Sequence, residues 1–178
     1  TLYFVTNSLP FTTSGYAIRT ENVANMLRGN GISLRVCTRV GYPLSVGRWT
    51  SELQSVQRKN GIVRLIPWSF SWDARKRRRQ SVRLLEREAR DLNARLIITT
   101  TSFEKASIVS EVARNLEIPW AYEVRGEPEA TWLADAAVRR DESSEFFQSS
   151  RLKENEAVQK SAAQIFLSHV SKESFETR

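Results

Sequence analysis

The sequence has 178 residues, of which 40% are hydrophobic and 26% charged, a balance that excludes a disordered tail, a collagen-like fibre and a disulfide-stapled mini-protein. The length is that of one domain with a sizeable core, and the formal net charge of +7 favours an anionic partner. No apolar run approaches the ~20 residues of a membrane-spanning helix and no signal peptide is evident, so we expect a soluble, cytoplasmic protein.

Two residue types that often carry chemistry occur once each. Cys37 is the single cysteine, which excludes an intrachain disulfide and a cysteine metal cluster, and His169 is the single histidine. A catalytic triad or a histidine zinc site would have to be built around His169, so we expect neither a metal nor a cofactor. Because Thr1 leads directly into a strand pattern and Arg178 closes a helix that has barely begun, we expect an excised fragment.

Strand and helix patterns alternate along the first part of the chain. The apolar run 2–5 predicts a strand, and apolar residues at helical spacing then predict a helix from Tyr16 that a glycine-rich turn closes. Residues 32–38 alternate apolar and polar side chains and predict a second strand. Residues 44–60 show no clear pattern, whereas the apolar run 62–68 predicts a third strand.

The rest of the chain repeats this alternation. Strand runs occupy 96–100, 118–124 and 165–168, and helical spacing recurs over 82–92, over 109–116, in two pieces within 127–163, and from Ser171. Such alternation is typical of parallel strands joined by helices. We therefore predict a Rossmann-like, doubly wound α/β domain, with a mainly parallel sheet and helices on both faces.

The first part of the chain also carries an order of motifs. A strand leads into Asn7-Ser8-Leu9-Pro10-Phe11 and Ser14-Gly15-Tyr16, and the second strand ends in Thr38-Arg39-Val40-Gly41-Tyr42-Pro43. This order resembles the start of the glycosyltransferases of family 4, also called group 1. In that family a Gly-containing loop opens the first helix, and a similar turn often ends the second strand.

Two later stretches extend the resemblance over nearly the whole chain. Residues 118–126 read Ile-Pro-Trp-Ala-Tyr-Glu-Val-Arg-Gly and look like the family's P-Y-E-V-R-G variant after a central strand. Residues 156–168 are similar to its E-A…A-D-x-V-I-x-x-S segment, although Ala163 stands where the acidic residue is usual.

The resemblance implies the GT-B architecture, in which two Rossmann-like domains face each other across a cleft and transfer a sugar from a nucleotide donor with retention of configuration. Residues 1–178 would be the N-terminal, acceptor-side domain, and the C-terminal domain that holds most of the donor lies outside them. The implied partners are a nucleotide-sugar donor and a glycan or lipid-linked acceptor. With half of the cleft absent, we expect this hexosyltransferase-type enzyme to be inactive as the present fragment.

The loop before the first helix is one candidate site. Gly15 lets a ligand approach the backbone closely, and the N–H groups at the start of the following helix favour an anion. In the family the corresponding loop, here Ser14 and Gly15, approaches the donor diphosphate. The alternative is that Gly15 merely turns the chain from strand into helix.

The end of the strand 118–124 is a second candidate site, because ligands of open parallel sheets bind beyond the carboxyl ends of the strands. Arg125 offers a fixed fork of donors for a phosphate, and Glu123 is placed to orient it or to accept a bond from a sugar hydroxyl. Many relatives carry a histidine near this point, so we predict that Arg125 instead stabilises the leaving phosphate electrostatically. The alternative is a structural Arg–Glu pair that closes a turn.

Three further residues belong to the same edge of the predicted sheet. Arg39, Tyr42 and Glu127 follow strands there, and we expect them on the acceptor side of the cleft. An aromatic–proline turn at Tyr42 and Pro43 that packs on its own loop explains this pair equally well.

A basic run precedes the amphipathic helix at 82–92. It consists of Arg75, Lys76, Arg77, Arg78 and Arg79, next to the aromatic residues Trp68, Phe70 and Trp72. Such a combination suits the headgroups of an anionic membrane, where each cation contributes ~1 kcal/mol. We therefore predict an exposed run, on a poorly ordered connection or a first helical turn, that makes peripheral contact with the inner face of the membrane. Nucleic acid is the competing anion, although no nucleic-acid-binding motif supports it.

Two functions from different classes follow from these observations. The leading hypothesis is the N-terminal domain of a retaining nucleotide-sugar glycosyltransferase. The alternative is a non-catalytic, basic α/β domain that binds a nucleotide or a nucleic acid through its charged surface.

Overall fold

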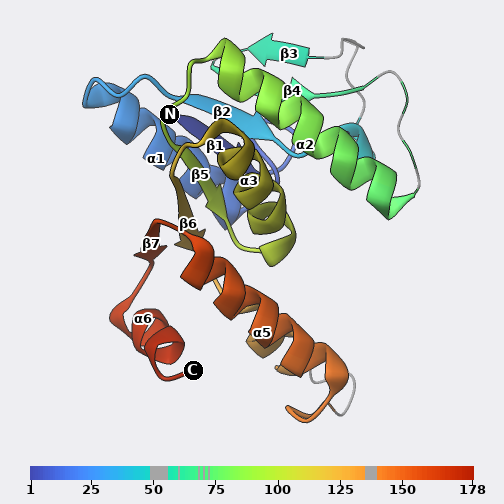
Figure 1. Ribbon diagram of the computed structural model, residues 1–178, viewed down its shortest axis with the longest axis vertical. Coiled ribbons are helices and arrows are strands. Elements are labelled where there is room, and N and C mark those ends of the chain that lie inside the picture. The colour runs from blue at the N-terminus through green and yellow to red at the C-terminus, as the bar shows by residue number, and fades with distance from the viewer. Residues whose placement is uncertain (49–55, 60, 68, 70, 72, 135–139) are drawn as a thin grey trace.

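The computed structural model describes residues 1–48, 56–59, 61–67, 69, 71, 73–134 and 140–178 (Figure 1). The strands are β1 (Leu2–Val5), β2 (Arg35–Thr38), β3 (Val56–Lys59), β4 (Ile62–Leu65), β5 (Ile97–Thr100), β6 (Trp120–Val124) and β7 (Ala163–Phe166). The helices are α1 (Gly15–Gly29), α2 (Ala74–Asp91), α3 (Phe103–Leu116), α4 (Pro128–Leu133), α5 (Glu145–Lys160) and α6 (His169–Glu176), with a 3-10 turn η1 (Leu44–Val46).

The strands form one sheet in the order β3-β4-β2-β1-β5-β6-β7. Every neighbouring pair is parallel except β3 and β4, which pair in antiparallel fashion. From β1 the chain proceeds outward through β2 and β4, and it then returns to the other side of β1 to add β5, β6 and β7. The strand order therefore reverses between β1 and β5, where open α/β sheets bind their ligands.

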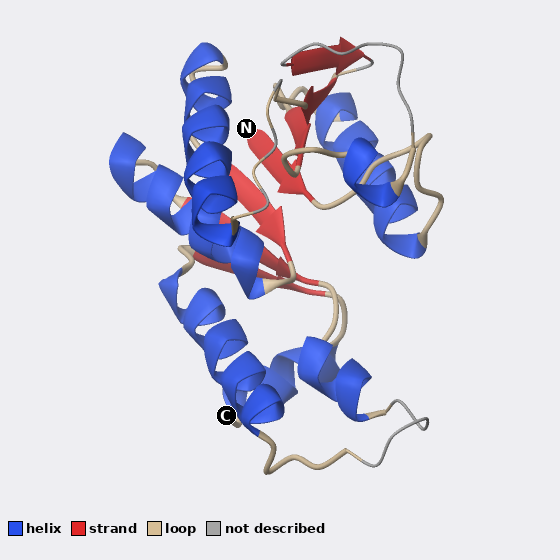
Figure 2. Ribbon diagram, turned by 90° about the vertical axis from the view of Figure 1, so that its right-hand side faces the viewer, coloured by secondary structure: helices blue, strands red, loops and turns tan. Residues whose placement is uncertain are grey.

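Helices cover both faces of the sheet (Figure 2). Tyr3 and Val5 point from β1 to the face covered by α1, where they pack with Ala24. Leu2 and Phe4 point to the opposite face, where the buried sides of α2, α3 and α5 join the core. Because β1 is buried at every position, its apolar run serves both layers. The predicted doubly wound, Rossmann-like fold is confirmed.

Several predicted boundaries differ from the structure. The second strand begins at Arg35, since Gly31 makes a turn at φ +77° and Ile32 remains exposed. The helix predicted from Ser171 begins at His169, because the Ser168 side chain accepts a hydrogen bond from the Ser171 N–H and caps it.

The segment without a clear sequence pattern contains η1 and the antiparallel strand β3. The following strand, β4, ends at Leu65, and the predicted strand residue Trp68 lies outside the described residues. In the described part of the chain, no helix combines the length and the hydropathy required to cross a membrane.

The packing of α2 on the sheet can be tested by truncating Leu85, which is fully buried on this helix. We expect Leu85→Ala to lower the free energy of unfolding by ~2–5 kcal/mol, because it removes apolar contacts and leaves a cavity. The matched control is Leu152→Ala on α5, where the side chain is 69% exposed and the change should stay within about 0.5 kcal/mol. Urea unfolding followed by circular dichroism measures both, and equal losses would contradict this packing.

Candidate functional site

A cavity of ≈ 920 Å³ lies at the carboxyl ends of β1, β5 and β6. Thr6 follows β1, Thr101 follows β5 and Arg125 follows β6, and all three line it. Ser14 and Tyr16 line it from the start of α1. The cavity therefore occupies the position that the reversal of strand order predicts for a ligand.

The predicted donor-phosphate loop lies at the rim of this cavity. Ser14 caps α1, since its Oγ accepts a hydrogen bond of 3.3 Å from the Ala17 N–H. Gly15 is exposed, and a Cβ placed on it would meet no other atom within 4 Å. The backbone at the start of α1 is thus open to a ligand, and its N–H groups carry the positive end of the helix dipole.

Arg125 is buried, and its guanidinium is bonded to protein groups on three elements. Nη1 donates to the Tyr16 carbonyl oxygen at 2.8 Å and to Thr20 Oγ1 at 2.9 Å, both on α1. Nη2 donates to Glu123 Oε2 at 2.9 Å and to the Tyr3 hydroxyl on β1. The arrangement fits the alternative of a structural Arg–Glu pair, which here ties the start of α1 to β1 and β6.

Glu123 is the anionic partner in this network. Its Oε1 accepts a hydrogen bond from Arg19 Nε at 2.7 Å, and its Oε2 accepts from the Tyr3 hydroxyl. Burial alone raises the pKa of Glu123, but the hydrogen bonds and charge of Arg125, with the bonds from Tyr3 and Arg19, hold it below its ordinary value. Burial and the Glu123 charge raise the pKa of Tyr3, so its hydroxyl stays neutral. The carboxylate is therefore ionised and fully engaged.

Gly126 has a packing role beside this network. The Tyr16 hydroxyl donates to the Arg125 carbonyl oxygen at 3.2 Å, and a Cβ on Gly126 would lie 3.1 Å from that hydroxyl. The absence of a side chain at Gly126 thus lets Tyr16 close over the end of β6.

The predicted acceptor-side residues lie in different surroundings. Tyr42 is fully buried, and its hydroxyl donates to the Ser8 carbonyl oxygen. The turn therefore packs on the loop after β1, whereas the alternative to an acceptor site was packing on its own loop. Glu127 lines the cavity, and its carboxylate pairs with Arg178 at the end of α6. Arg39 follows β2 and lines a second hollow rather than this cavity.

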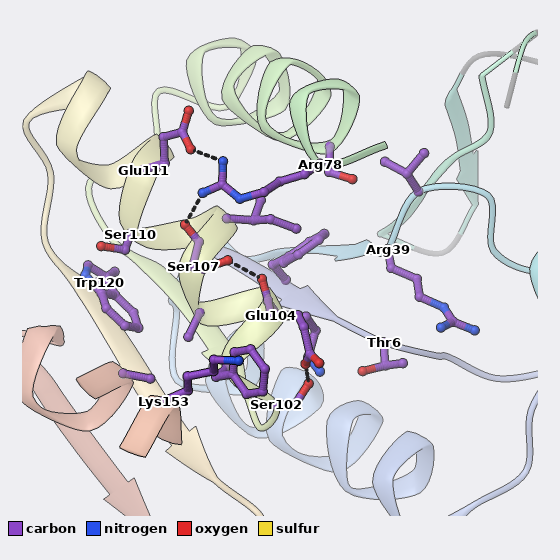
Figure 3. A pocket seen from close by; sticks show the side chains of 18 of the residues that line it. Thr6, Arg39, Arg78, Ser102, Glu104, Ser107, Ser110, Glu111, Trp120 and Lys153 are labelled. Atoms are coloured by element: carbon purple, nitrogen blue, oxygen red, sulfur yellow. Dashed lines mark hydrogen bonds and ion pairs between the residues drawn. The ribbon is translucent and has the colours of Figure 1, made fainter. Parts of the chain in front are cut away.

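This second hollow, of ≈ 1040 Å³, runs along α3 beside α2 and α5 (Figure 3). Thr6, Ser102 and Lys105 line both spaces, so the two meet at the start of α3. Arg39 extends toward Thr6, whereas the ion pair of Arg78 lies elsewhere along α3 in Figure 3.

Lys105 is a site residue that the sequence reasoning missed. It is buried in the first turn of α3, and its Nζ donates to the Thr101 carbonyl oxygen at 2.7 Å. The signal was its helical spacing with Val109 and Val112, which places a lysine on the apolar, inward face. Asn7, which also lines the cavity, was passed over as well, and its Oδ1 is buried without a hydrogen-bond partner.

The basic run forms the first turns of α2, an ordered helix capped by Asp73, rather than a poorly ordered connection. Arg77 is half-buried, and Arg75, Lys76, Arg78 and Arg79 are exposed. Arg78 pairs with Glu111 and donates to the Ser107 carbonyl oxygen at 3.2 Å. The neighbouring aromatic residues, Trp68, Phe70 and Trp72, lie outside the described residues.

Taken together, the fold and the cavity define a Rossmann-like α/β domain with a ligand cleft at the reversal of strand order. The structure is similar to that of UDP-GlcNAc 2-epimerase from Methanocaldococcus jannaschii, with a TM-score of 0.60 and 10% identity over 99% of this chain and 42% of that one. MurG from Acinetobacter baumannii gives a TM-score of 0.44 and 15% identity over 71% of this chain and 35% of that one. The chain thus spans less than half the length of either protein.

No protein-family model matches the sequence, and no curated protein is significantly similar to it. The structural similarity therefore establishes the fold. Among the residues with a described placement, no group of three or more His, Cys, Asp or Glu side chains is arranged to hold a metal ion.

The Arg125 network makes a prediction about stability. We expect Arg125→Met to lower the free energy of unfolding by ~3–5 kcal/mol, because it leaves the buried Glu123 carboxylate without its main partner. The matched control is Arg19→Ala, since Arg19 binds the same carboxylate but is 41% exposed and should contribute less than about 1 kcal/mol.

Thermal or urea unfolding of both variants measures this difference. The double variant Glu123→Gln, Arg125→Met should lose less than the sum of the two single losses, since neither charge is then left unpaired. Additive losses would contradict a coupled pair.

Proposed function

We propose that residues 1–178 form the N-terminal, acceptor-side domain of a GT-B-type glycosyltransferase similar to family 4. The observation that carries the proposal is the cavity at the carboxyl edge of the sheet, bounded by the open start of α1 at Ser14 and Gly15 and by the end of β6. The enzyme would transfer a hexose with retention of configuration from a nucleotide sugar to a glycan or lipid-linked acceptor. Most of the donor site would belong to a second domain.

Two of the stretches on which the resemblance rests meet in space around this cavity, whereas residues 156–168 do not line it. Asn7 and Ser14 from the first stretch line it, as do Arg125 and Gly126 from the third. Tyr42 from the second stretch holds the loop that contains Ser8. Residues far apart in the sequence thus converge on one place, as the motifs of a binding site should. The similar structure described above is that of a UDP-GlcNAc 2-epimerase, which supports a nucleotide sugar as the ligand.

In this proposal the start of α1 receives the donor diphosphate. Gly15 permits close approach, and the helix N–H groups provide donors. Arg125 and Glu123 act mainly as positioning residues, because their bonds fix Tyr16 and Thr20 in the first turns of α1. The buried guanidinium behind that turn also adds positive potential where a leaving diphosphate would gather charge.

The donor assignment is tested with Gly15→Val. A Cβ at this position meets no other atom within 4 Å, and the valine side chain would project into the space proposed for the diphosphate. We therefore expect at least a tenfold loss of UDP-sugar binding with unchanged melting temperature. Gly29→Val at the other end of α1, which also meets no atom within 4 Å, is the matched control. Saturation-transfer NMR with a panel of nucleotide sugars suits the weak binding expected of half a cleft.

Equal binding by the two variants would place the diphosphate elsewhere. Sugar transfer by the 178 residues alone would contradict the assignment to one half of a GT-B enzyme, because only groups that contact the transition state accelerate the reaction.

The basic run on α2 is proposed as a peripheral contact with an anionic membrane on the cytoplasmic side. Cations at the start of a helix oppose its dipole, so Arg75, Lys76 and Arg79 gain no helix stability from their position. All three are exposed. A negatively charged surface would compensate for this unfavourable arrangement.

Replacing Arg75, Lys76 and Arg79 by Gln should weaken binding to vesicles that contain phosphatidylserine by at least tenfold at low salt, and by less at high salt. The control removes the same charge at the exposed residues Arg83, Arg87 and Arg95, and should have a much smaller effect. Sedimentation of vesicles and a DNA mobility shift are measured in parallel. Loss of DNA binding with unchanged vesicle binding would favour the alternative, a nucleic-acid-binding domain.

A further inference from the structure

Two cations beside the cleft, Arg39 and Lys105, form no ion pair with any described residue. Arg39 Nε is buried without a hydrogen bond, and within the described residues no ion pair or side-chain hydrogen bond engages its guanidinium. Lys105 is buried, and within the described residues the only hydrogen bond of its ammonium group goes to the Thr101 carbonyl oxygen. In contrast, the third cation of this edge, Arg125, is paired with Glu123.

The positive charge of Lys105 is only partly compensated by the carboxylates near it. Burial lowers the pKa of its amine to about 8, and the nearby charges of Arg39 and Arg125 add to this effect. Glu104 and Glu154 act in the opposite direction but do not outweigh it.

Neither of these carboxylates forms an ion pair with Lys105 among the described residues, and both accept hydrogen bonds from other groups. Glu104 accepts a hydrogen bond from the Ser102 hydroxyl, and Glu154 accepts from the Tyr122 hydroxyl and the Phe103 N–H. Burial raises the pKa of Glu154, which further weakens it as a counter-ion. The described residues therefore leave the buried Lys105 ammonium group without an ion-pair partner, and a bound anion would supply one.

The neighbouring groups are suited to a tetrahedral oxyanion. Thr6 and Ser102 lie at the meeting point of the two hollows. Thr6 provides a hydroxyl there, the Ser102 hydroxyl donates to Glu104, and α3 begins directly after Ser102. Arg39, labelled in Figure 3, supplies a planar fork of donors. Lys105 supplies a compact ammonium group. Two unmatched positive charges correspond to the two negative charges of a phosphate monoester.

We propose that Arg39 and Lys105, with Thr6 and Ser102, form a subsite for a phosphoryl group carried by the acceptor. This inference rests on the proposed function, which places the acceptor in this domain, and it adds the chemical class of the acceptor. The hollow of ≈ 1040 Å³ continues from the subsite along α3 to Arg77 and Arg78 on α2, and gives space for the rest of the molecule.

The test is calorimetric binding of inorganic phosphate at pH 7 to the 178-residue chain. Lys105→Met and Arg39→Gln should each weaken binding at least tenfold. The matched controls, Lys172→Gln and Arg87→Gln, remove exposed cations outside both hollows and should bind as the parent does. Lys105→Met should not lower the melting temperature, because it removes a buried charge, so loss of binding with a retained fold separates a ligand contact from a structural role.

A pH series identifies the Lys105 ammonium, with sulfate as a probe that does not titrate. As pH rises from 7 to 9, the amine loses its proton and affinity should fall about tenfold. The charged groups that face the Lys105 amine are Glu104, Glu154, Arg39 and Arg125. The fall should persist in Arg39→Gln and vanish in Lys105→Met; a fall that persists in Lys105→Met overturns the assignment.

Competition with UDP separates this proposal from the donor assignment. Phosphate binding that UDP leaves unchanged supports an acceptor subsite. If UDP displaces phosphate, and this displacement requires Lys105, then Arg39 and Lys105 belong to the donor site and the inference is overturned. Equal phosphate binding by all variants also overturns it, with the proposed function intact. If phosphate binds as expected but no nucleotide sugar binds, the proposed function fails and the acceptor assignment fails with it.

Discussion

The buried ion pair between Glu123 and Arg125 determines how the cleft is built. A buried charge pair is stabilised when further hydrogen bonds satisfy its donors and acceptors, and here α1 and β1 provide partners for both terminal nitrogens of Arg125. The requirement fixes the start of α1 against the ends of β1 and β6. As a result the open backbone at Gly15 has a defined position at the rim of the cavity.

Much of the fold could be predicted because the parallel strands are buried on both faces. Such strands appear as short apolar runs, as at 2–5 and 96–100, and helical spacing between them identifies the crossovers. The strand β3 was missed because its pairing with β4 depends on a partner in space rather than on a pattern of its own. The start of α6 was missed because one capping hydrogen bond from Ser168 decides it.

The edge of the sheet that carries the candidate site could be predicted from the sequence, but the direction of the side chains there could not. Residues after the strands were expected at one edge, and the structure places Ser14, Arg125 and Glu127 around one cavity there. Whether Arg125 faces the ligand or the interior depends on Tyr3 and on α1, more than 100 positions away in the chain. Lys105 was overlooked because a lysine within a helix is ordinarily exposed, whereas this one is buried.

The carboxylate of Glu127 lies between the cavity and the Arg178 side chain. It borders the cavity, and it also accepts the Arg178 guanidinium, which reaches Glu129 as well and so holds the end of α6 against α4. A ligand that recruits this carboxylate does so in competition with Arg178. By thermodynamic reciprocity, whatever stabilises the docked position of α6 weakens such a ligand by the same factor, and whatever releases α6 strengthens it. One side chain thereby couples occupancy of the cleft to the freedom of the last helix.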